Sequence, residues 1–126
     1  MISRNNFDNL TVPRFSDVFP QAVVAGDFIF VSGTVGVDPG TGILREGFEE
    51  QAIQAFTNIK TILEELGSTL NKVVKTTVFM VSGNDFTILN KVYKDVFPEH
   101  APARSTPQVM PFPSGILISV ECIAIV

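Results

Sequence analysis

The sequence predicts an α+β domain in which two helices pack on one face of a mixed β-sheet. Residues 48–66 and 85–97 carry apolar side chains at helical spacing, whereas residues 73–81 are rich in β-branched side chains and residues 116–125 alternate in polarity. At 126 residues the chain is long enough for one domain, residues 1–126, with a real hydrophobic core.

The N-terminal third is expected to supply a hairpin. Residues 1–20 are mixed in character and leave room for one short strand. Residues 21–25 and 28–32 are predicted strands, joined by Gly26-Asp27, because glycine accepts positive φ at little cost. The run 28–32 is continuously apolar, which predicts that both of its faces are buried.

The glycine-rich loop 33–42 resembles a phosphate cradle only superficially. It lacks the lysine of a P-loop, and its glycines do not match the dinucleotide-binding spacing. Asp38-Pro39-Gly40 is typical of a tight turn. Ser32-Gly33, at the end of the preceding strand, marks a place where the backbone can approach a ligand without an intervening side chain.

The first helix is predicted from Phe48 to Leu66, with glutamates near its N-terminus and Gly67 as its stop. Its polar face, which includes Asn58, is expected to be solvated.

The second helix is predicted to span about Asp85 to Phe97, capped by Asn84 or Ser82. Asn90 lies off its apolar stripe, and Tyr93, the single tyrosine, is expected in the core.

The C-terminal segment places one arginine and one glutamate in the middle of two predicted strands. Glu121 falls on the less apolar face of residues 116–125, where a carboxylate costs free energy unless it is paired or hydrogen-bonded. A turn at residues 111–115 would fold this strand back on the Arg104 segment, so that the two charges converge on one pocket. The alternatives are an ordinary structural ion pair and an edge-strand charge that blocks aggregation.

Composition narrows the classes of function. The formal net charge of −4 argues against a nucleic-acid binder, which needs a basic face. Charged residues make up 17% of the chain and hydrophobic residues 45%, which favours an oligomer over the alternative of a well-filled monomer. With one cysteine, Cys122, and one histidine, His100, we expect no internal disulfide, no metal site and a reducing, cytoplasmic location without membrane spans.

A set of short motifs, in order, covers nearly the whole chain. The motifs are Pro20-Gln21-Ala22-Val23, Gly26-Asp27-Phe28-Ile29-Phe30-Val31-Ser32-Gly33, Gln51-Ala52, Asn58-Ile59-Lys60, Val74-Lys75-Thr76-Thr77-Val78-Phe79, Asn84-Asp85-Phe86, Pro102-Ala103-Arg104-Ser105-Thr106 and Glu121-Cys122-Ile123-Ala124. Taken together they resemble the Rid family, the YjgF-like reactive intermediate deaminases.

The resemblance implies a chorismate-mutase-like (YjgF-like) fold, assembled as a homotrimer with ligand clefts between subunits. It also implies hydrolysis of 2-imino acids such as 2-iminobutanoate and 2-iminopropanoate, or of their 2-enamine tautomers, to 2-keto acids and ammonia, without a cofactor. The family's arginine falls on Arg104, which would bind the substrate carboxylate, and its water-handling acid falls on Glu121.

The resemblance places the other pocket positions at Ser32, Gly33, Asn90 and Thr106. Phe19 stands where active deaminases of the family carry a tyrosine, and Pro107 also departs from the common pattern. Two alternative functions remain. The first is a non-catalytic regulatory trimer that binds small carboxylates. The second is an endoribonuclease or translation-inhibitor activity, and the acidic composition of the chain argues against it.

Overall fold

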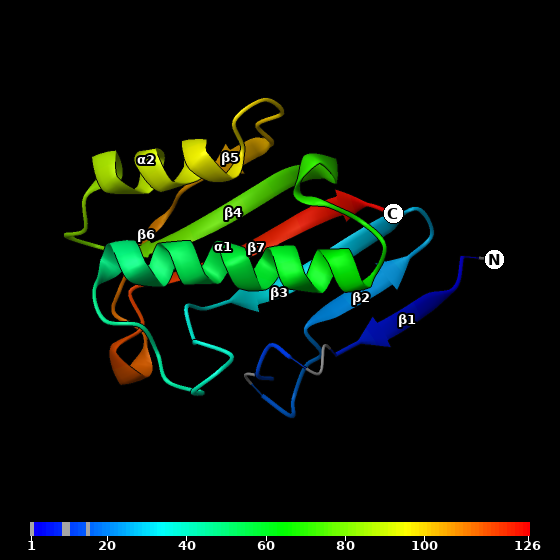
Figure 1. Cartoon of the computed structure of the whole chain (residues 1–126), viewed down its shortest axis with the longest axis horizontal. Coiled ribbons are helices and arrows are strands. Elements are labelled where there is room, and N and C mark those ends of the chain that lie inside the picture. The colour runs from blue at the N-terminus through cyan, green and yellow to red at the C-terminus, as the bar shows by residue number, and fades with distance from the viewer. Residues whose placement is uncertain (1, 9–10, 15) are drawn as a thin grey trace.

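The computed structural model describes residues 2–8, 11–14 and 16–126 and has the predicted α+β architecture (Figure 1). One seven-stranded mixed sheet carries both α-helices on the same face. The elements in chain order are β1 (Arg4–Phe7), β2 (Ala22–Ala25), β3 (Phe28–Thr34), α1 (Phe48–Glu65), η1 (Leu70–Lys72), β4 (Val73–Val81), α2 (Phe86–Val96), β5 (Ala103–Ser105), β6 (Gln108–Val109), η2 (Pro113–Gly115) and β7 (Ile118–Ile125).

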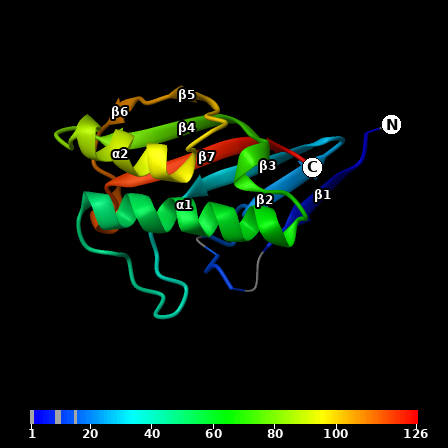
Figure 2. The same cartoon turned by 45° about the horizontal axis from the view of Figure 1, so that its top comes forward.

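The strand order β1-β2-β3-β7-β4-β5, with β6 also beside β4, follows from two helical crossovers. Strands β3 and β4 are both antiparallel to the β7 strand between them, so they run parallel to each other and α1 connects them. Strand β5 is parallel to β4, and α2 makes that connection. Parallel strands need a long crossover, usually a helix, and here both crossovers lie on one side of the sheet (Figure 2).

The hydrophobic core lies between the helices and the sheet. Strand β7 shows the predicted alternation, since Ile118, Val120, Cys122 and Ala124 are all buried. Phe56 is the largest of the fully buried side chains of α1 that pack against this face. The period-two pattern of the strand and the helical stripe of α1 therefore meet in one core.

Most element boundaries agree with the prediction to within a residue or two. Strand β4 matches its predicted range, and Gly67 follows α1 with a φ of +79°, which favours glycine. The predicted cap of α2 is wrong by one residue. The N-cap is Asp85, whose side chain accepts the N–H of Thr87 at 2.7 Å, whereas the Asn84 amide donates to the Val81 carbonyl at 2.8 Å.

The predicted hairpin between the Arg104 segment and the last strand is wrong. Strand β5 pairs in parallel with β4, and β7 pairs with the other edge of β4, so β4 separates the two segments. The turn at residues 111–115 leads from β6 into β7 past β4 rather than between adjacent strands. The turn was predicted to form a hairpin because no local feature of the sequence indicates that β4 lies between the two segments that the turn follows and precedes.

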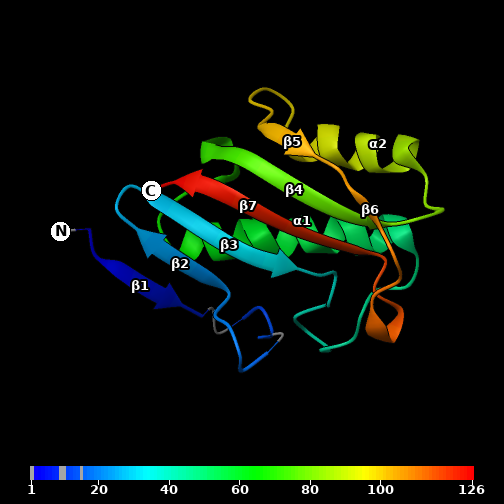
Figure 3. The same ribbon diagram turned by 180° about the vertical axis from the view of Figure 1, so that it is seen from behind.

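The second face of the sheet is open in the single chain (Figure 3). The prediction that residues 28–32 are buried on both faces is wrong for this chain alone. Ile29 and Val31 are buried beneath the helices, but Phe28 and Phe30 point to the other face and are each 44% exposed. Ile125 of β7, which is paired with Phe28, is 43% exposed on the same face. This face, with its exposed apolar side chains, is hereafter called the open face.

Position 36 requires glycine because its backbone lies directly against the backbone of α1. A Cβ built on Gly36 would lie 2.4 Å from the carbonyl oxygen and 2.6 Å from the Cα of Gln51. We expect Gly36→Ala to push the loop off the helix and to lower the free energy of unfolding by about 1–3 kcal/mol or more, measured by urea denaturation. Gly40→Ala is the control, since its added Cβ would meet Asp38 only at an ordinary 3.5 Å. Equal losses in the two variants would contradict this account.

Candidate functional site

Arg104 lies in the middle of β5 and points to the helix-covered face. It is paired with Thr76 of β4, and paired residues place their side chains on the same face of a sheet. Thr76 is buried against α2, where its hydroxyl shares a 2.7 Å hydrogen bond with the hydroxyl of Tyr93. The guanidinium carbon of half-buried Arg104 lies 4.8 Å from the centroid of the Tyr93 ring. Arg104 is therefore held at the β5 edge of the domain.

Asn90 and Thr106 belong to the same edge. Asn90 is exposed on α2 and precedes Tyr93 by three residues, a spacing that makes the two side chains neighbours on the helix surface. Thr106 is half-buried and follows β5 directly. After it, the carbonyl of Pro107 accepts the N–H of Met80 at 3.1 Å, so the chain stays beside β4 as it passes from β5 to β6. Arg104, Asn90 and Thr106 are hereafter called the arginine half.

Glu121 lies on the open face. It is paired with Thr77 of β4 and is exposed, while its neighbours Val120 and Cys122 point into the core. Arg104 and Glu121 are thus on strands that flank β4, but their side chains leave opposite faces of the sheet. Neither of them lines any of four hollows that the described residues form.

An apolar hollow of about 260 Å³ lies on the open face near Glu121. Ser119, which is two residues before Glu121 on the same face of β7, lines it, and this spacing corresponds to about 6–7 Å along a strand. The other lining residues are Phe19, Gly33, Val35, Phe112, Pro113 and Ile116. The hollow therefore has a carboxylate near its rim and largely hydrocarbon walls.

Gly33 of β3 lines this hollow, and the preceding residue, Ser32, anchors the segment that carries Phe19. The Ser32 hydroxyl donates to the Pro20 carbonyl at 2.8 Å and so ties the segment that carries Phe19 to the sheet. A Cβ on Gly33 would lie 2.8 Å from the hydroxyl oxygen of Ser119, too close for any other residue without movement. The pairing of β3 with β7 shifts register between Val31 and Thr34, around Gly33. Phe19, Ser32, Gly33 and Glu121 are hereafter called the acid half.

Polar side chains of α1 fix the loops around the hollow, a role that the sequence alone did not predict. Gln51 donates to the Gly115 carbonyl at 3.2 Å and accepts the N–H of Leu117 at 2.9 Å, which holds the loop that carries Phe112. Asn58 was predicted to be solvated, and this is wrong. It is 1% exposed and donates to the carbonyls of Val35 and Val37 at 3.1 and 2.9 Å.

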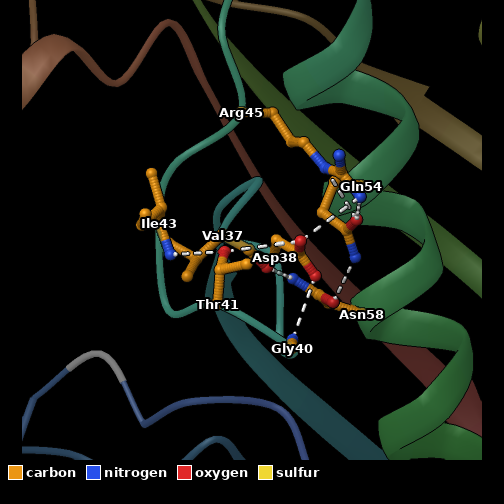
Figure 4. A network of polar contacts seen from close by, with 8 residues as sticks. All are labelled: Val37, Asp38, Gly40, Thr41, Ile43, Arg45, Gln54 and Asn58. Carbon is orange, nitrogen blue, oxygen red and sulfur yellow. Dashed lines mark hydrogen bonds and ion pairs between the residues drawn. The ribbon is translucent and has the colours of Figure 1, made fainter.

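A wider network stiffens the glycine-rich loop (Figure 4). The Gln54 amide donates to Asn58 at 2.8 Å, and Arg45 donates to Gln54 at 3.2 Å and pairs with Asp38 at 3.6 Å. The spacing of Gln51, Gln54 and Asn58, three and four residues apart, places them on one side of α1. Amide side chains that recur at helical spacing next to an apolar stripe are the sequence signal that could have predicted these three residues to be buried.

Two titratable groups near the β4–β7 pair have shifted pKa values. Burial raises the pKa of Tyr93, while the hydrogen bond with Thr76 and the positive charge of Arg104 act to lower it. Burial also raises the pKa of the Cys122 thiol to about 12, and the negative charge of Glu121 adds to the rise. Cys122 is therefore a neutral core side chain rather than a nucleophile.

Among residues 2–8, 11–14 and 16–126, no three His, Cys, Asp or Glu side chains are grouped as a metal site would require. None of the helices in this part of the chain has the length and apolar character needed to cross a membrane.

Comparison with known proteins identifies the family. The family model described as Endoribonuclease L-PSP matches residues 12–126. The chain belongs to this family, which is also called the YjgF, RutC or Rid family. The family membership that the ordered motifs predicted is thereby confirmed, and so is the YjgF-like fold.

Individual members of the Rid family resemble the chain over most of its length. A RutC family protein of Pyrococcus abyssi is 45% identical over 113 residues, 89% of each chain. The human 2-iminobutanoate/2-iminopropanoate deaminase is 40% identical over 108 residues, 85% of this chain and 79% of the human protein. The crystal structure of Escherichia coli TdcF with bound serine superposes with a TM-score of 0.89 at 32% identity, and covers 97% of this chain and 98% of TdcF.

The pKa of Cys122 leads to a prediction about thiol reactivity. Because only the thiolate reacts, we expect native protein to react with 5,5′-dithiobis(2-nitrobenzoate) far more slowly than urea-unfolded protein at mildly alkaline pH. Glu121→Gln should leave this protection largely intact, since burial is the main cause. The unfolded chain loses the thiol proton first, so the free energy of unfolding should fall as pH rises from about 8.5 toward 12. Rapid labelling of the native protein would contradict the assignment.

Proposed function

We propose that this protein hydrolyses 2-imino acids, or their 2-enamine tautomers, to 2-keto acids and ammonia. The proposal also places each active site between two copies of the chain, with the arginine half from one and the acid half from the other. The observation that carries it is a complementary pair of half-sites. One presents the guanidinium of half-buried Arg104 over an aromatic ring, and the other presents the exposed residue Glu121 near an apolar hollow. The similarity to the human deaminase supplies the reaction class.

Arg104 would bind the substrate carboxylate. A guanidinium presents its N–H donors as a planar fork, and a carboxylate accepts two of them side by side. Among the described residues Arg104 takes part in none of the ion pairs, which join Arg14, Arg45, Lys60 and Lys91 to acids. Its charge is therefore available to an external anion. The serine bound in the TdcF structure is a small molecule with a carboxylate of this kind.

Glu121 would handle the water. As the water oxygen bonds to the imine carbon, the carboxylate accepts one of its protons and the electron pair of the C=N bond moves to the protonated nitrogen. The same carboxyl group then returns the proton to the amine, and the carbon–nitrogen bond breaks. The products are ammonia and, after loss of the hydroxyl proton, the keto group. The imine carbon is already electrophilic, so positioning and modest acid–base assistance are sufficient.

The open face provides the reason for assembly. A row of half-exposed apolar side chains on one side of a sheet, in a chain with only 17% charged residues, is the kind of surface that protein interfaces bury. We propose that copies of the chain cover one another's open faces as a homotrimer. That arrangement would bring the β5 edge of one copy to the hollow of the next.

A charge on the open face tests the assembly. Phe30→Asp should prevent association, because it would bury a carboxylate in an apolar interface, and light scattering should show a lower mass than for the wild type. Ile53→Asp is the matched control: Ile53 is 42% exposed, compared with 44% for Phe30, but lies on α1 on the helix side. Loss of association in both variants, or in neither, would contradict an interface on the open face.

Subunit complementation tests the shared site. We expect Arg104→Ala and Glu121→Gln each to reduce release of ammonia and 2-ketobutanoate from freshly generated 2-iminobutanoate by about 100-fold or more. When the two variants are co-expressed and mix at random in a cyclic oligomer, about a quarter of the interfaces join the intact arginine half of one variant to the intact acid half of the other. Activity should then recover to about a quarter of the wild-type value. Lys72→Ala, on the exposed η1 turn, is the control for the loss of a charge.

Two outcomes would contradict the proposal. Wild type no faster than Arg104→Ala would exclude deaminase activity, and co-expression without recovery would place the whole site in one chain. The absence of a hydroxyl at Phe19 favours one alternative, a trimer that binds small carboxylates without turnover. Binding of 2-ketobutanoate by an inactive wild type, with activity gained in Phe19→Tyr, would establish that alternative.

A further inference from the structure

The side chain that holds Arg104 is itself held on several sides. The Tyr93 ring packs edge-on against Phe56, with centroids 5.7 Å apart and planes at 78°, and lies 4.9 Å from the Phe97 ring. Its hydroxyl and that of Thr76 share a 2.7 Å hydrogen bond within the core. Tyr93 is itself 8% exposed. A ring fixed by two aromatic neighbours and a hydrogen bond cannot follow the guanidinium, so the guanidinium must adapt to the ring.

We propose that Tyr93 is a positioning residue, whose ring presents the Arg104 guanidinium in a fixed orientation to the substrate carboxylate, and that Thr76 locks this ring in place. This inference rests on the proposed role of Arg104. It assigns a function to a tyrosine and a threonine that otherwise look like ordinary core side chains.

The geometry of a guanidinium makes the two contacts compatible. Stacking on an aromatic ring uses the face of the guanidinium plane, whereas the N–H donors lie in that plane and point outward from its edge. One guanidinium can therefore lie over Tyr93 and still bind a carboxylate with two parallel hydrogen bonds. A side chain that is already ordered also loses less conformational entropy on binding than a free arginine does.

The proposal separates binding from chemistry in the mutant kinetics. Tyr93→Leu removes the ring, and we expect KM for 2-iminobutanoate to rise about 3- to 30-fold while kcat changes little. Tyr93→Phe keeps the ring and should recover most of the lost affinity. Thr76→Val removes only the hydroxyl that holds the ring and should raise KM less than Tyr93→Leu does. Val92→Ala, a truncation of the adjacent buried residue on α2, is the control for general loss of core packing.

Tyr93 also provides a readout that does not depend on activity. The chain has one tyrosine and no tryptophan, so its tyrosine emission and phenolate absorbance report on this site alone. The groups that act on the phenol are Thr76 on β4, Arg104 on β5 and Cys122 on β7, and Arg104 lowers its pKa. We expect Arg104→Ala to raise the phenol pKa in an alkaline absorbance titration. Titration with 2-ketobutanoate should change the tyrosine emission of the wild type to saturation, but not that of Arg104→Ala.

These measurements distinguish the failure of this inference from the failure of the proposed function. A wild type that neither turns over 2-iminobutanoate nor binds 2-ketobutanoate would overturn the proposed function and, with it, the role of Tyr93. If the wild type is active but Tyr93→Leu has the KM of Val92→Ala, the positioning role is excluded and the deaminase remains. An unchanged phenol pKa in Arg104→Ala would contradict the close approach of the guanidinium to Tyr93.

Discussion

The position of β4 between β7 and β5 is the constraint on which the arrangement of the site depends. Thr76 is paired with Arg104 on one side and with Cys122 on the other, while the next residue, Thr77, is paired with Glu121. Because side chains alternate along a strand, this single-residue offset sends the arginine to the helices and the glutamate to the open face. The pairing of the backbone strands is therefore enough to place Arg104 and Glu121 on opposite faces of the sheet.

If the proposed function is correct, the same register explains why one copy of the domain would hold only half of each active site. In the described part of the chain Arg104 lies against an aromatic ring and Glu121 lies near a hollow, but neither residue takes part in the ion pairs. The proposed interface between copies would bring the two residues together and would cover apolar side chains of the open face. The proposed assembly and the proposed catalysis would then both depend on the uncovered face of the sheet.

Much of the fold could be predicted because its signals are local. The stripe of α1, the alternation of β7 and the β-branched run of β4 each follow from periodicities of a few residues, and all three were found in the structure. The pairing of β5 could not be predicted in this way, since a strand of three residues carries no periodic signal. The prediction that Asn58 is exposed was wrong because its side chain donates hydrogen bonds to backbone carbonyls that are distant in the sequence. These bonds satisfy the amide and allow a polar residue to be buried.

The candidate site was predictable only by resemblance. The residue types at Arg104 and Glu121 indicated a carboxylate binder and a base, but spacing alone suggested a hairpin that the structure does not contain. The contact of Arg104 with Tyr93 lay beyond the sequence for a similar reason. It joins a strand to a helix, and only the packed structure determines which residues meet there.

Pro107 has a consequence for how the sheet ends. By separating β5 from β6 it divides one rim of the sheet into runs of three and two residues, and the opposite rim is the short, polar strand β1. Neither rim offers a long unbroken row of free backbone donors and acceptors onto which a foreign strand could add. Short edge strands of this kind disfavour strand-by-strand addition at the rims of the sheet, so the exposed apolar side chains of the open face are the remaining surface for association.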